Sequence, residues 1–166
     1  MTKSLILVRH AQSINLQQGI KDIERSLTDT GVQEAYKIGK YLNNTKLRPD
    51  LIYTSNAERA VSTAKLIAEQ TGNEDHEIIM LDDLYEASFR ILLKIINQLE
   101  NKYNNVLIIG HNPAISFLCE FLSDHAIGEI VPAGICILKF NDMDWETIGK
   151  ASGQIFEYIS PSEINL

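Results

Sequence analysis

The chain has 166 residues, a formal net charge of −7 and a pI near 5.1, and apolar residues make up 45% of it. This length suits one domain with a core of its own, and an acidic balance without a basic run argues against a nucleic-acid partner. No apolar run approaches the ~20 residues that cross a bilayer, so we expect no membrane partner.

Two features favour a cytoplasmic protein. The N-terminal apolar run is short and has no cleavage-site pattern, so we expect no signal peptide. Cys119 and Cys136 lie in apolar segments and lack the spacing of a metal site. We therefore expect two buried free thiols in a reducing compartment.

The first half of the chain alternates strands with helices. Residues 4–8 form an apolar strand that runs into Arg9 and His10, and a polar surface loop follows over 14–26. A second strand is expected over 51–55, followed by a helix over 57–71 with Arg59 in its first turn. Thr28 is expected to cap the intervening helix, whose inward face would carry Val32, Ala35, Tyr36, Gly39 and Leu42.

The second half continues the alternation. We expect a strand over 77–81, a helix capped by Ser88, and an apolar strand over 106–110 that runs into His111. Pro113 is expected to open the next helix, and residues 133–140 are expected to form a further strand. Residues 145–148 are expected to pair back as a hairpin, and the tail over 154–166 to tie the C-terminus to the body.

This alternation predicts an α/β fold, a three-layer α/β/α sandwich with a mostly parallel central sheet. Ligands bind beyond the carboxyl ends of the strands in such sheets. Three of the apolar strands lead into residues that bind anions, so two histidines and two arginines should gather at one edge. These are Arg9, His10, Arg59 and His111.

The sequence resembles the histidine phosphatase superfamily, and within it the small SixA-type phosphohistidine phosphatases. Matching blocks occur in the family's order over nearly the whole chain, so the resemblance implies that residues 1–166 form a single histidine-phosphatase-like domain. The blocks are Leu7-Val8-Arg9-His10-Ala11-Gln12-Ser13, Leu27-Thr28-Asp29-Thr30-Gly31, Ser55-Asn56-Ala57-Glu58-Arg59-Ala60, Leu84-Tyr85-Glu86-Ala87-Ser88 and Gly110-His111-Asn112-Pro113.

The resemblance implies a role for each residue at the strand ends. His10 would be the nucleophile that forms a phosphohistidine intermediate, and Arg9, Arg59 and His111 would bind the phosphate, with no metal or other cofactor. The Ser13 hydroxyl is a further candidate for binding phosphate. Motifs of nucleotide-binding P-loops, dinucleotide folds, serine hydrolases and zinc proteases are absent from the sequence.

Glu86 leaves two substrate classes open. It matches the position at which many family members place an acid that protonates the leaving oxygen, but a surface carboxylate beside Asp82 and Asp83 explains it equally well. We prefer a phosphohistidine on a signalling protein as substrate, because the chain is short and lacks the segments that cover the pocket in sugar-phosphate enzymes. The alternatives are a phosphomonoesterase for a small metabolite and a phosphate-binding adaptor without turnover.

Overall fold

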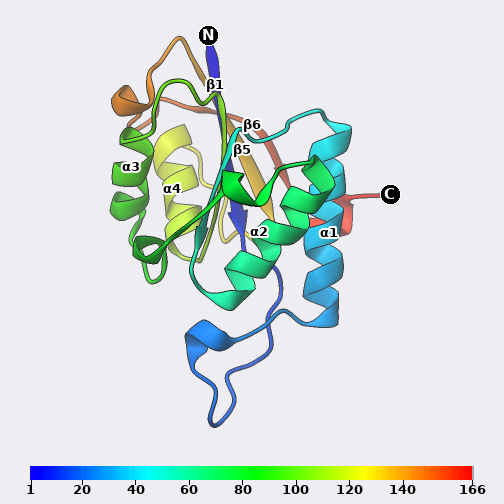
Figure 1. Ribbon diagram of the computed structural model, residues 1–166. Helices are drawn as coiled ribbons and strands as arrows, with labels where there is room; N and C mark the ends of the chain where they lie inside the picture. Colours follow the sequence, from blue (N-terminus) through cyan, green and yellow to red (C-terminus); the bar gives the residue numbers. More distant parts are fainter. Residues whose placement is uncertain (166) are drawn as a thin grey trace.

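The computed structural model describes residues 1–165 and contains one six-stranded sheet (Figure 1). The strands are β1 (Thr2–Arg9), β2 (Leu51–Ser55), β3 (Ile78–Leu81), β4 (Asn105–Gly110), β5 (Ile135–Asn141) and β6 (Gln154–Ile159). Their order is β3-β2-β4-β1-β5-β6. The first four strands run parallel, and β5 and β6 continue the sheet in antiparallel pairing.

Four helices cover the two faces of the sheet (Figure 1). Helices α1 (Asp29–Asn44) and α2 (Glu58–Thr71) pack on one face, and α3 (Phe89–Asn97) and α4 (Ala114–Ser123) on the other. Alternate residues of β1 serve the two faces, since Leu5 and Leu7 join the core under α3 and α4, while Ile6 and Val8 join the other. This arrangement confirms the three-layer α/β/α sandwich.

The predicted helix caps are present. The Thr28 hydroxyl accepts a hydrogen bond from the backbone N–H of Gly31 at 3.0 Å, and the Ser88 hydroxyl accepts one from that of Ile91 at 3.4 Å. The predicted inward face of α1 is partly wrong, because Val32 and Tyr36 are each 38% exposed. The buried face is instead formed by Gly31, Ala35, Ile38, Gly39 and Leu42.

Close approach of two backbones explains how α1 is turned. A Cβ atom at Gly31 would lie 2.0 Å from the carbonyl oxygen of Gln12, so only glycine allows the helix to begin this close to the segment after β1. The first turn of α1 therefore packs directly behind the segment that carries His10.

Two expectations for the C-terminal half are wrong. Residues 145–148 do not form a hairpin, because Asn97 donates its amide hydrogens to the carbonyl oxygens of Trp145 and Ile148 and holds the segment in a 3-10 turn. Strand β6 pairs with β5 in its place. The structure also joins Cys119 of α4 to Cys136 of β5 in a disulfide, whereas we expected two free thiols.

The register of the sheet brings the chemistry-bearing strand ends together. Arg9 at the end of β1 pairs with Gly110 at the end of β4, so His10 and His111 follow at neighbouring positions. On the other side of β4, Thr54 of β2 pairs with Ile109. Because β1 and β6 belong to one sheet, we infer that the described residues, 1–165, form a single domain, and residue 166 of the predicted 1–166 domain lies outside them. None of the helices within residues 1–165 is long and apolar enough to cross a membrane.

Candidate active site

A cavity of about 270 Å³ lies at the carboxyl ends of the parallel strands. Its wall contains five of the six residues that the sequence singled out, and the exception is Ser13. The lining residues are Arg9, His10, Asp22, Arg25, Arg59, Tyr85, Glu86, His111 and Asn112. The cavity therefore combines two imidazoles with three guanidinium groups.

The ring of His10 is held in one tautomer. Its Nδ1 lies 2.8 Å from the carbonyl oxygen of Ala11, which only accepts hydrogen bonds, so Nδ1 carries the proton and Nε2 is unprotonated. The backbone N–H of Ala11 donates in turn to the hydroxyl of buried Thr63, at 3.0 Å. His10, which lines the cavity, therefore has Nε2 as its unprotonated ring nitrogen.

His111 lies beside His10, with 5.0 Å between the ring centroids. Its Nε2 is 2.9 Å from the hydroxyl of Ser55 at the end of β2, and that hydroxyl accepts the backbone N–H of Ala57 at 3.2 Å. The Ser55 hydroxyl can therefore donate its own hydrogen to Nε2, which leaves Nδ1 of His111 as an N–H donor. A donor of this kind suits the oxygens of a phosphoryl group.

Burial lowers the pKa of both histidines. The pKa of His10 falls to about 4: burial is the main cause, the hydrogen bond to Ala11 opposes it, and the positive charges of Arg59 and Arg9 contribute to the lowering. The pKa of His111 falls to about 3, because burial is reinforced by repulsion from His10 when that ring is protonated and by the charge of Arg59. Both rings are therefore neutral at pH 7, which a histidine nucleophile requires.

Arg59 connects His10 to the loop over 14–26 through hydrogen bonds to both. The guanidinium is nearly buried, and its Nε donates to His10 Nε2 at 3.4 Å. Its two terminal nitrogens donate to Asp22, Nη1 to the carbonyl oxygen at 2.8 Å and Nη2 to the carboxylate at 3.1 Å. Asp22 thereby fixes the orientation of the guanidinium beside His10.

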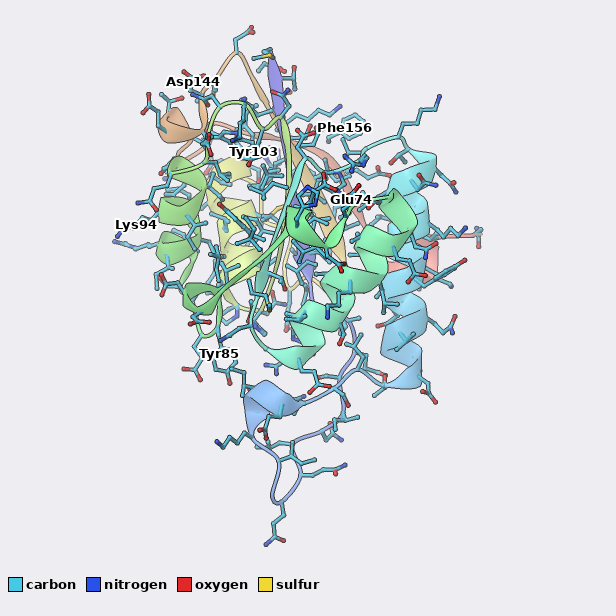
Figure 2. All side chains as sticks on the ribbon, viewed as in Figure 1. Glu74, Tyr85, Lys94, Tyr103, Asp144 and Phe156 are labelled. Atoms are coloured by element: carbon cyan, nitrogen blue, oxygen red, sulfur yellow. A yellow bond between two sulfur atoms is a disulfide. The ribbon has the colours of Figure 1, made fainter. Side chains whose placement is uncertain are left out.

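Asp22 is the centre of a network that the sequence did not reveal. Its carboxylate accepts hydrogen bonds from the Tyr85 hydroxyl at 2.6 Å and from Arg25 at 2.9 Å. The Tyr85 hydroxyl is the main cause of the lowered pKa of Asp22, followed by Arg25. Figure 2 shows Tyr85 at the same end of the molecule as the loop over 14–26, and Tyr103 and Asp144 at the opposite end. The acidic and basic residues of this loop were the signal for such a network, but from the sequence we interpreted them as a solvent-exposed surface loop.

Arg9 lies on the other side of His10. Its Nη1 donates to the carbonyl oxygen of Ile130 at 2.9 Å and lies 3.5 Å from a carboxylate oxygen of Glu129. Its Nε is buried and has no hydrogen-bond partner within residues 1–165. Arg9 thus adds positive charge to the cavity and forms an ion pair with Glu129, whose side chain is 73% exposed.

The remaining candidates occupy different positions. Glu86 lines the cavity from an exposed position and has a φ of 56°, a left-handed conformation that is uncommon outside glycine. Ser13 does not line the cavity, and its hydroxyl accepts a hydrogen bond from Arg25 at 2.9 Å. The other two histidines, His76 and His125, are exposed and lie outside the cavity. Over the described part of the chain, the acidic, histidine and cysteine side chains form no cluster of three that suits a metal ion.

The chain is similar to known proteins in sequence. The model of the histidine phosphatase superfamily (branch 1) matches residues 5–94. The 2,3-bisphosphoglycerate-dependent phosphoglycerate mutase of Bartonella tribocorum is 41% identical over 93 residues, which are 54% of this chain and 44% of that protein. The enzyme of the same description from Methylorubrum populi is 37% identical over 93 residues, 54% of this chain and 43% of its own. The matches thus span less than half the length of these relatives.

Solved structures share the fold over nearly the whole chain. The putative phosphohistidine phosphatase SixA from Agrobacterium tumefaciens has a TM-score of 0.83 at 22% identity, covering 96% of this chain and 98% of that one. The protein histidine phosphatase SixA complexed with tungstate has a TM-score of 0.84 at 18% identity, covering 98% and 99%. A mycobacterial glucosyl-3-phosphoglycerate phosphatase has a TM-score of 0.71 at 17% identity, covering 96% of this chain and 100% of that one.

Proposed function

The chain belongs to the histidine phosphatase superfamily, and we propose that it hydrolyses phosphoryl groups through a phosphohistidine formed on His10. The observation that carries this proposal is the hydrogen bond from His10 Nδ1 to the carbonyl oxygen of Ala11. It leaves Nε2 unprotonated inside a cavity lined by guanidinium groups. A neutral imidazole in an anion-binding cavity is the arrangement that attack on phosphorus needs.

In the first step, the lone pair of His10 Nε2 forms a bond to phosphorus while the bond to the leaving group breaks. Arg9 and Arg59 balance the charge on the phosphoryl oxygens, and His111 donates a hydrogen bond to one of them. In the second step, water attacks phosphorus, the bond from phosphorus to Nε2 breaks, and its electron pair returns to the imidazole. Inorganic phosphate and the water's proton are released.

The preferred substrate is a phosphohistidine on another protein. A phosphorylated imidazole that carries a proton on its second nitrogen departs as a neutral ring, so this reaction needs no strong general acid. The cavity of about 270 Å³ has the scale of one phosphorylated side chain. The likeness of the fold to SixA proteins over 96% of the chain is consistent with this substrate.

The position of Glu86 favours a second candidate function, hydrolysis of a small phosphomonoester. An alkoxide is a poor leaving group and needs a proton, and Glu86 lines the cavity where it can supply one. Replacing Glu86 with Gln should lower kcat for phosphomonoesters by about 10²-fold and change phosphohistidine hydrolysis little. Equal losses on both substrates would contradict this leaving-group argument.

Trapping the intermediate tests the proposal directly. After brief incubation with a phosphohistidine protein labelled with phosphorus-32, alkaline denaturation should preserve label on the chain, and acid should remove it. The His10→Ala variant should carry no label, whereas His76→Ala, a change at an exposed histidine, should label like the wild type. A wild-type chain that binds phosphate but acquires no label and releases none would instead be an adaptor.

We further propose that turnover needs no metal ion. Three guanidinium groups line the cavity and supply the positive charge that a metal would otherwise provide. Prolonged dialysis against a chelator should therefore leave kcat unchanged. A loss that added Mg²⁺ or Zn²⁺ restores would refute this part of the proposal.

A further inference from the structure

A second cavity, of about 480 Å³, adjoins the catalytic cavity and shares the side chains of Arg9 and Asn112 with it. It lies between the N-terminal half of α4 and the loop that connects α4 to β5. Pro113, Phe117, Glu120 and Glu129 contribute to its wall. A molecule bound in the catalytic cavity can therefore extend past Arg9 and Asn112 into this groove.

The groove has an apolar surface, formed by a side chain that is not part of the hydrophobic core. Phe117 is 54% exposed, while Ile115, Leu118 and Cys119 of the same helix are fully buried. The ring thus contributes little to the core and stands beside exposed Pro113 at the groove. An apolar side chain of a ligand would cover surface that water otherwise contacts.

The groove differs in charge from the catalytic cavity. Glu129, whose side chain is 73% exposed, and Glu120 place carboxylates in its wall. One carboxylate oxygen of Glu120 accepts the backbone N–H of Ile127 at 2.9 Å, which holds this side chain in place. A ligand that spans both cavities would therefore present an anion to the guanidiniums of the first and a cation to the carboxylates of the second.

The wall between the cavities is rigid. Asn112 donates its amide to the carbonyl oxygen of Ile130 at 2.8 Å and accepts the Ser116 hydroxyl at 2.6 Å. The Ser116 hydroxyl accepts the backbone N–H of Ile130 at 3.0 Å. These bonds tie the start of α4 to the loop, so the groove is formed before any ligand arrives, which limits the entropy lost on binding.

We propose that this groove binds the polypeptide that flanks the phosphorylated side chain of the substrate, with an apolar residue against Phe117 and a basic residue facing Glu120 and Glu129. The inference rests on the proposed function, and it assigns the specificity of that reaction to the groove. A small phosphorylated metabolite would leave the groove empty. A basic, apolar segment of a protein fills it.

The experiment compares two substrates of the same reaction. One is phosphoramidate, which enters the catalytic cavity alone, and the other is a phosphohistidine peptide with leucine and lysine on both sides of the histidine. The ratio of kcat/KM for the peptide to kcat/KM for phosphoramidate should fall about tenfold in Phe117→Ala and in Glu129→Gln. Replacing the peptide's lysines with glutamate should lower the ratio for the wild type but not for Glu129→Lys.

The matched control is Phe156→Ala, which removes from β6 a ring of similar exposure, 60% against 54% for Phe117. Phe156 and Tyr85 lie at different ends of the molecule (Figure 2), and this variant should keep the wild-type ratio. Wild-type ratios in Phe117→Ala and Glu129→Gln would overturn the inference and leave the proposed function standing. A wild-type chain that turns over neither substrate would instead overturn the proposed function.

Discussion

Acidification from pH 7 to pH 5 should destabilise the folded protein through His10 and His111. Burial lowers their pKa values to about 4 and about 3, whereas a histidine of the unfolded chain titrates near 6.5. Between these values the unfolded state binds more protons than the folded state. The stabilising contribution of the pair is therefore complete above pH 6.5 and is lost as the pH falls toward the folded pKa values.

The size of the effect follows from these shifts. If a histidine stays neutral in the folded protein but is protonated in the unfolded chain, the free energy of unfolding falls by about 2 kcal/mol between pH 7 and pH 5. Partial solvent contact reduces this, so we expect the pair to lower the free energy of unfolding by about 2–4 kcal/mol. Asp22 does not add to this loss of stability, because its lowered pKa keeps the carboxylate of the folded protein charged from pH 7 to pH 5.

Urea unfolding followed by circular dichroism at both pH values measures the loss. The double variant with His10→Asn and His111→Asn should lose less than half as much stability as the wild type on acidification. The His76→Asn variant should behave like the wild type, because the side chain of His76 is 76% exposed. If the double variant lost as much as the wild type, the cavity histidines would not be the groups that resist protonation.

Two further predictions concern the segments that hold the site. Gly31→Ala should lower the free energy of unfolding by about 2 kcal/mol or more, because its Cβ would lie 2.0 Å from the backbone oxygen of Gln12. Gly149→Ala, whose Cβ meets nothing within 4 Å, should shift stability by less than about 0.5 kcal/mol, and similar thermal unfolding of both variants would refute the close approach. Tyr85→Phe removes the hydroxyl that donates to Asp22 and should raise the pKa of that carboxyl toward its ordinary value. A carbon-13 NMR titration measures this pKa, and an unchanged value would contradict the hydrogen bond.

The local sequence pattern determined most of the strands and helices, and it placed four candidate site residues at the strand ends. Branched apolar runs form strands, and hydroxyl side chains cap helices, through neighbours a few residues away, so the amino-acid sequence alone predicts both. Because parallel strands present their carboxyl ends at one edge, the order of these elements also implied that His10 and His111 meet. Their ring centroids lie 5.0 Å apart.

Contacts between distant segments were decided only by the tertiary structure. Asp22 lies 37 residues from Arg59 and 63 from Tyr85, and nothing in the polar loop marks it as their common partner. The side of α1 that faces the core depends on the approach of Gly31 to Gln12, and the turn at Trp145 depends on the amide of Asn97. Such contacts form only after the intervening chain has folded, so no periodicity of the sequence encodes them.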